Sequence, residues 1–129
     1  MRELRGPSIT LKLVVESDEL LAMEGSYDGD GAMPPPHLHP HQDEHFEVLE
    51  GTIHAIVDGE ERRYGAGEAF DVPAGTVHQM AAEGPSRVRW EVRPALRTAE
   101  FFARLYSGDA GPGFLEQYAE EFRLVPSRG

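Results

Sequence analysis

The sequence contains no cysteine and only one lysine, Lys12. Both facts limit the metal sites and catalytic groups that the chain can form. Without cysteine the chain has no disulfide, no thiolate metal site and no cysteine nucleophile, so any metal must be bound by His, Asp or Glu. The single lysine lies in a predicted N-terminal strand, which argues against Schiff-base catalysis.

Positive charge is also scarce, since 12 Lys and Arg residues stand against 23 Asp and Glu, for a formal net charge of −11. Such a surface repels phosphate backbones and anionic lipids, so neither nucleic acid nor a membrane is an expected partner. No apolar run approaches the roughly 20 residues that cross a bilayer, and charges interrupt the N-terminal segment where a signal peptide would be apolar. We therefore expect a soluble, cytoplasmic protein that acts on a small organic molecule.

A chain of 129 residues with 40% apolar residues is expected to form one domain, with a barrel over about 8–93 and a helical tail over about 95–125. Glycine and proline interrupt the region 25–94 so often that the segments between them fit strands better than helices. Alternating apolar residues at 9–15, 53–57 and 88–92 support about eight or nine short strands. Asp58-Gly59 predicts a hairpin turn. The pattern indicates an all-β sandwich or small barrel.

After Pro94 the apolar spacing becomes helical. Thr98 is the predicted cap of a helix that ends at Gly108. Apolar side chains then recur at helical spacing, which predicts a second amphipathic helix through Leu115, Tyr118, Phe122 and Val125. We interpret both as short helices that close the barrel, and a dimer contact is the alternative.

Five of the six histidines lie between His37 and His54, and the sixth is His78. On an extended backbone His37 and His39 point to the same face, and Glu44 follows five residues later. Two imidazoles and a carboxylate on neighbouring strands are a common nitrogen and oxygen donor set for a borderline divalent metal.

Two segments resemble the motifs of the cupin superfamily over about residues 25–93. The first is Gly31-(5)-His37-Leu38-His39-(4)-Glu44-(6)-Gly51, and the second is Gly67-(5)-Pro73-Ala74-Gly75-(2)-His78. One position departs from the pattern, because Ala82 stands where the second motif usually ends in Asn. The resemblance implies an all-β double-stranded β-helix, or jelly-roll barrel, with one mononuclear metal site per subunit. The implied ligands are His37, His39, Glu44 and His78.

The other histidines leave a second motif frame open, in which His39 and His41 form the pair and His37 and Glu44 are left out. In the preferred frame His41 lies in a turn at the rim. His45 and His54 then face away from the cavity, because strand alternation places their neighbours inward.

Large apolar residues on the predicted strands are candidate walls of a pocket for a flat or aromatic molecule. They are Met33, Phe46, Val48, Phe70, Met80 and Trp90. The alternative is that these residues only form the hydrophobic core.

The resemblance implies a divalent transition metal, with Fe, Mn, Ni, Zn and Cu not distinguished. It also implies a small metalloenzyme of dioxygenase, isomerase, decarboxylase or cyclase type. The alternative is a non-catalytic cupin that binds or senses a metal or ligand. We further expect a homodimer, with the strand from Ile9 to Val15 as an exposed edge.

Overall fold

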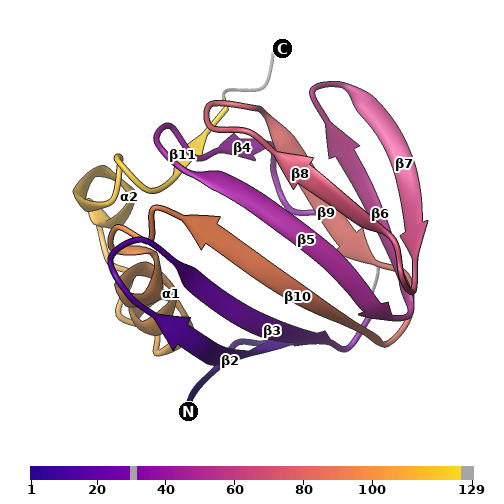
Figure 1. The fold of residues 1–129 in the computed structure, drawn as a ribbon. Coiled ribbons are helices and arrows are strands. Elements are labelled where there is room, and N and C mark those ends of the chain that lie inside the picture. The colour runs from indigo at the N-terminus through magenta and orange to yellow at the C-terminus, as the bar shows by residue number, and fades with distance from the viewer. Residues whose placement is uncertain (30–31, 126–129) are drawn as a thin grey trace.

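The computed structural model describes residues 1–29 and 32–125, so Gly31 of the first motif lies outside the described residues. Antiparallel strands form two sheets that face each other (Figure 1). The first sheet has the order β1 (Arg2–Arg5), β2 (Ile9–Glu16), β3 (Leu21–Tyr27), β10 (Ser86–Arg93), β5 (Asp43–Glu50) and β8 (Ala69–Val72). The second has the order β11 (Arg123–Leu124), β4 (His37–Leu38), β9 (His78–Ala82), β6 (Thr52–Val57) and β7 (Glu60–Gly65). Neighbours such as β3 and β10 are distant in sequence, and the predicted double-stranded β-helix is confirmed.

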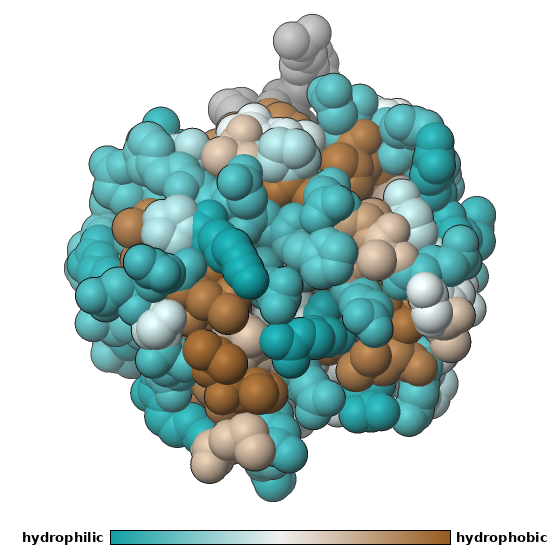
Figure 2. Space-filling view, viewed as in Figure 1, coloured by the Kyte–Doolittle hydropathy of each residue, from teal (hydrophilic) through white to brown (hydrophobic). Residues whose placement is uncertain are grey.

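Strand alternation places the apolar residues between the two sheets. Leu11, Val48, Ile53 and Val88 are fully buried. The faces that point outward carry the charge, and Figure 2 shows polar residues over most of one face with apolar residues in separate patches between them. Burial of one face of each strand stabilises the barrel and fixes the strand register.

Two glycine turns show why the predicted hairpins form. Asp58 and Gly59 both have positive φ, at 52° and 79°, and join β6 to β7 as the sequence predicts. Gly51 links β5 to β6 with φ 84°, and a Cβ there would lie 2.2 Å from Ser86 Oγ. Only glycine satisfies both the conformation and the close approach.

The tail differs from its prediction. Helix α1 spans Thr98–Tyr106, but Arg97 holds the N-cap position and makes no side-chain cap. Helix α2 spans only Phe114–Gln117, and the predicted second helix is wrong beyond it. Arg123 and Leu124 instead form β11, which pairs with β4. Backbone pairing with the barrel overrides the helical spacing of the apolar residues, and Figure 1 shows both helices gathered at one end of the barrel.

The predicted edge strand is also wrong. β2 lies between β3 and β1, because Arg2–Arg5 pair with residues 10–13 and cover it. The edges of this sheet are β1 and β8.

Within the described residues, no helix is long and apolar enough to cross a membrane.

Candidate metal centre and its cavity

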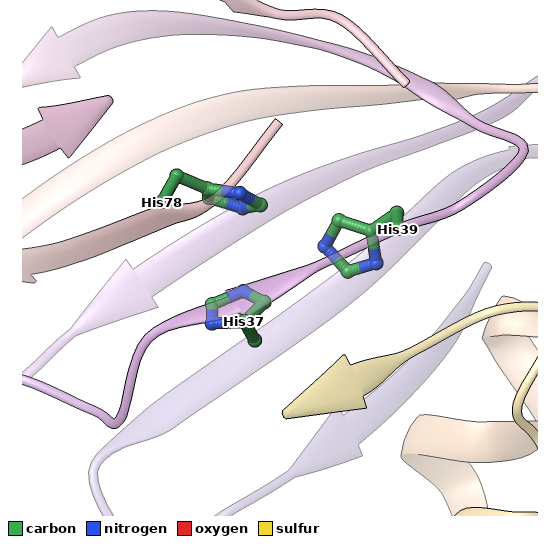
Figure 3. A group of neighbouring side chains, drawn as sticks. All are labelled: His37, His39 and His78. Carbon is green, nitrogen blue, oxygen red and sulfur yellow. The ribbon is translucent and has the colours of Figure 1, made fainter. Parts of the chain in front are cut away.

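Three histidines converge inside the barrel from two neighbouring strands. His37 opens β4, His39 follows it, and His78 opens β9 directly opposite His37. Their candidate ligand atoms all lie within 4.8 Å of one another, and Figure 3 shows the rings turned toward a common space. His39 and His78 are buried, with exposures of 7% and 3%. The three side chains can therefore hold a metal ion.

Each ring is oriented by a main-chain carbonyl that accepts a hydrogen bond from its Nδ1. The three distances are 3.1 Å from His37 to Pro35 O, 2.7 Å from His39 to Glu121 O, and 3.0 Å from His78 to Thr76 O. Because a carbonyl only accepts, the proton of each neutral imidazole is on Nδ1. The Nε2 lone pair of each ring is then free for a metal, which is the arrangement seen at His ligands generally.

The carboxylate of Glu44, on β5, lies beside two of these histidines. Its Oε1 lies 3.1 Å from Nε2 of both His39 and His78, and its Oε2 accepts a hydrogen bond of 2.7 Å from Trp90 Nε1. Oε1 is buried and no hydrogen bond satisfies it. A carboxylate oxygen that faces two nitrogen lone pairs needs a cation between them, and this observation shows that the residues fit a divalent metal.

When no metal is bound, protonation of a histidine supplies part of the positive charge beside Glu44. Burial by itself lowers the pKa of His39, but the charge of Glu44 and the hydrogen bond to the Glu121 carbonyl raise this pKa overall. Burial by itself raises the pKa of Glu44, but His39 and His78 lower it to about 2. Burial and the neighbouring His78 lower the pKa of His37 to about 4. Glu44 is thus ionised and His37 neutral near pH 7.

The turn of the second motif holds the ligand loop in place. The Gly75 N–H donates to the carbonyl of His39 at 2.9 Å, and the Ala74 N–H donates to Asp43 Oδ1 at 2.8 Å. These contacts join the turn before β9 to the segment between β4 and β5. The spacing of the two motifs therefore has a physical basis, because hydrogen bonds join the turn of the second motif to His39 and Asp43 in the first.

Sequence reasoning missed the contribution of the tail. Besides the Glu121 carbonyl on His39, the Phe122 ring stacks on His37 with centroids 4.9 Å apart and an interplanar angle of 21°. Gln42 was missed as well, and its Nε2 lies 2.7–3.0 Å from three acceptors at the start of the tail. No local pattern signals these contacts, because they join residues 52–85 positions apart.

A cavity of about 440 Å³ adjoins the candidate metal centre. Of the predicted wall residues, Phe46, Met80 and Trp90 line it. Val48 and Phe70 lie in the hydrophobic core instead, and Met33 is not part of the lining. Alternation identifies the inward face of a strand but not the end of the barrel to which a residue belongs. The tail supplies much of the remaining wall, through Phe101, Phe102, Leu105, Tyr106, Leu115, Phe122 and Leu124.

The other histidines lie outside this cluster. His41, His45 and His54 pair with the carboxylates of Glu120, Asp71 and Glu61 at 2.6, 2.7 and 2.6 Å. Each of these carboxylates is more than half exposed. The structure thus brings together the histidines of the preferred motif frame, and His41 points to a surface carboxylate rather than to His39.

Comparison with known proteins agrees with this architecture. The Cupin domain family model matches residues 26–92. KdgF from Halomonas sp. is similar in structure, with 30% identity, a TM-score of 0.70, and coverage of 77% of this chain and 93% of KdgF. An RmlC-like cupin from Shewanella frigidimarina shares 24% identity, with a TM-score of 0.69 and coverage of 76% and 87%.

More distant structures share the fold alone. Pac13, a nucleoside dehydratase, has 15% identity, a TM-score of 0.65, and coverage of 96% of this chain and 83% of Pac13. Among curated proteins no sequence matches this chain. The matched motifs, the two facing sheets and the clustered histidines agree, and the chain belongs to the cupin family.

Proposed function

We propose that this chain is a small metal-dependent enzyme that acts on an organic molecule in the barrel cavity. In this proposal His37, His39, Glu44 and His78 bind one divalent transition ion. The observation that carries it is the buried Glu44 Oε1, which has no hydrogen bond and faces two Nε2 atoms at 3.1 Å. Three neutral imidazoles and one carboxylate reduce the charge of a bound divalent ion to +1 and suit Fe, Mn, Ni, Zn or Cu.

When bound, the ion would supply Lewis acidity that polarises an oxygen atom of the substrate. The chain's own residues hold the donors still. The carbonyls on the three Nδ1 atoms fix the rings, and the Trp90 indole fixes the carboxylate of Glu44. Rigid donors of this kind lose little entropy when they engage an ion or a substrate.

The cavity favours an enzyme over a metal store. Its volume of about 440 Å³ lies within the range of pockets that enclose small organic ligands, and all four proposed metal ligands line it. Aromatic and aliphatic walls exclude water and strengthen electrostatic interactions at the reacting oxygen. A site that only stored or sensed a metal needs no such space beside the ion.

The proposal is tested on protein purified without a histidine tag. Elemental analysis is expected to show one transition ion per chain, and the His37→Ala/His78→Ala variant is expected to lose it. The matched control is His45→Ala/His54→Ala, which removes two histidines that face exposed carboxylates and keeps the metal. Undiminished metal in the first double variant would show that the assignment is wrong.

Catalysis is tested separately with a mixture of cellular metabolites, profiled by mass spectrometry before and after incubation. The wild-type protein is expected to deplete at least one compound with matching appearance of a product, and the metal-deficient variant is expected to change none. Stoichiometric capture of a compound that is released unchanged would assign the chain to the binding class instead.

A further inference from the structure

The cavity is poor in polar groups beyond the proposed metal ligands. Among the described residues that line it, the other polar side chains are Ser8, Tyr27, Trp90 and Tyr106. The Trp90 N–H is already used by Glu44. No Arg or Lys is part of the described lining. A second charged group on a ligand would therefore lose its hydration without gaining a counter-charge, which is costly.

Tyr27 occupies a space that a glycine creates. Met23, Gly25 and Tyr27 follow one another on the inner face of β3, and Gly25 has an ordinary extended backbone, so its glycine is not required by conformation. A Cβ at Gly25 would lie 3.1 Å from Tyr27 Cε2 and 3.4 Å from the Tyr27 hydroxyl. The phenol thus folds back along β3 over Gly25, toward the level where Met23 pairs with Trp90.

The hydroxyl at the end of this ring is available to a ligand. No hydrogen bond joins it to any other residue that the structure describes, and Tyr27 lines the cavity. Burial, with smaller contributions from Tyr106 and Glu44, raises the pKa of Tyr27 well above its usual value. The phenol therefore stays protonated at neutral pH and presents a donor.

We propose that the Tyr27 hydroxyl is the second polar anchor of the cavity and hydrogen-bonds an acceptor on the part of the ligand that lies over Gly25. The ligand class is a flat, mainly apolar molecule with a metal-binding oxygen at one end, an uncharged acceptor at the other and no further charge. Stacked walls such as Phe46 and Trp90, with ring centroids 5.6 Å apart, fit the flat body. This inference rests on the proposed function, because the metal-binding end of the ligand requires the metal.

The test uses four synthetic probes on the cobalt-loaded protein: naphthalene-2-hydroxamic acid and its 6-acetyl, 6-isopropenyl and 6-carboxy derivatives. The hydroxamate supplies the metal-binding oxygens. Acetyl and isopropenyl have nearly the same shape, but only acetyl accepts a hydrogen bond. Calorimetry is expected to show that the wild type binds the acetyl probe about three- to tenfold more tightly than the isopropenyl probe, the range of a neutral hydrogen bond. The carboxy probe is expected to bind more weakly than both.

Tyr27→Phe removes only the hydroxyl, so the ratio is expected to fall to about 1 while the isopropenyl probe keeps its affinity. Tyr64→Phe is the matched control, because Tyr64 stacks on Phe70 outside the cavity lining and should leave the ratio unchanged. Equal binding of the two probes by the wild type, or an unchanged ratio in Tyr27→Phe, would overturn the role of Tyr27 alone. Failure of every hydroxamate to bind the cobalt-loaded wild type would instead overturn the proposed metal and cavity function.

Discussion

Replacing Glu44 by Gln gives the sharpest prediction about the site, because the change keeps the shape of the side chain and removes its charge. In the structure Oε1 lies 3.1 Å from Nε2 of His39 and of His78, and Trp90 holds Oε2 at 2.7 Å. An amide at this position can still bond the Trp90 indole through its oxygen and face the two imidazoles with its NH₂ group. The metal-free variant is therefore expected to fold, with a circular dichroism spectrum like that of the wild type.

Metal affinity is expected to fall strongly although the fold stays the same. Partners outside the ligand set of a metal typically contribute a factor of about 10–100 in affinity. A direct ligand that also supplies the negative charge of the site should contribute more, so Glu44→Gln is expected to weaken binding by more than about 100-fold, or about 2.7 kcal/mol. Trp90→Phe removes the hydrogen bond behind the carboxylate and replaces the buried indole with a smaller ring. It is expected to weaken metal binding by about 10–100-fold.

Both variants are measured by competition with a chromophoric chelator, using nickel and zinc at pH 7.5. A Glu44→Gln protein with wild-type affinity and selectivity for both ions would refute the reasoning, since Glu44 would then lie outside the ligand set. Equal losses in Glu44→Gln and Trp90→Phe would place Glu44 among the outer partners and leave three histidines as the ligands.

Three further predictions concern stability. In the metal-free protein the pKa of His37 is lowered to about 4, so on acidification the unfolded state takes up a proton before the folded state does. The free energy of unfolding is therefore expected to fall as the pH decreases from 6.5 to 4. Denaturant titrations of His37→Gln should show a weaker dependence of this free energy on pH, and an unchanged dependence would contradict the assignment. Gly51→Ala is expected to lower the free energy of unfolding by at least about 2 kcal/mol more than Gly59→Ala does. Positive φ costs about 1–2 kcal/mol at either site, but only a Cβ at position 51 would also clash with Ser86 Oγ, at 2.2 Å. Equal melting temperatures of the two variants would contradict this. Gln42→Leu leaves three acceptors at the start of the tail without their donor. Chemical denaturation is expected to show a loss of at least about 2 kcal/mol in the free energy of unfolding. An unchanged free energy would show that water replaces the amide.

The barrel and the clustering of His37, His39 and His78 were predictable from sequence, partly from short-range patterns and partly from the two motifs. A period of two places His37 and His39 on one face, and the turn before β5 brings Glu44 back beside them. The match to two motifs added His78, which no local pattern connects to the others. The Asp58-Gly59 turn was predictable for the same local reason, since its residues tolerate positive φ.

The part of the cavity wall that the tail supplies could not be predicted in this way. Helical spacing of apolar residues predicted a second helix through Phe122, but pairing of β11 with β4 places that ring against His37 instead. The bond from Trp90 to Glu44 joins residues 46 positions apart, and only the pairing of β10 with β5 brings them together. Long-range pairing outweighs local propensity wherever the tail meets the barrel.

Anomalous scattering from crystals of the metal-loaded protein shows whether one divalent ion lies among His37, His39, Glu44 and His78. A single strong peak is expected about 2.0–2.2 Å from Nε2 of each of the three histidines and from one carboxylate oxygen of Glu44. A peak at His41 or His45, or coordination through an Nδ1 atom that now donates to a carbonyl, would contradict this expectation.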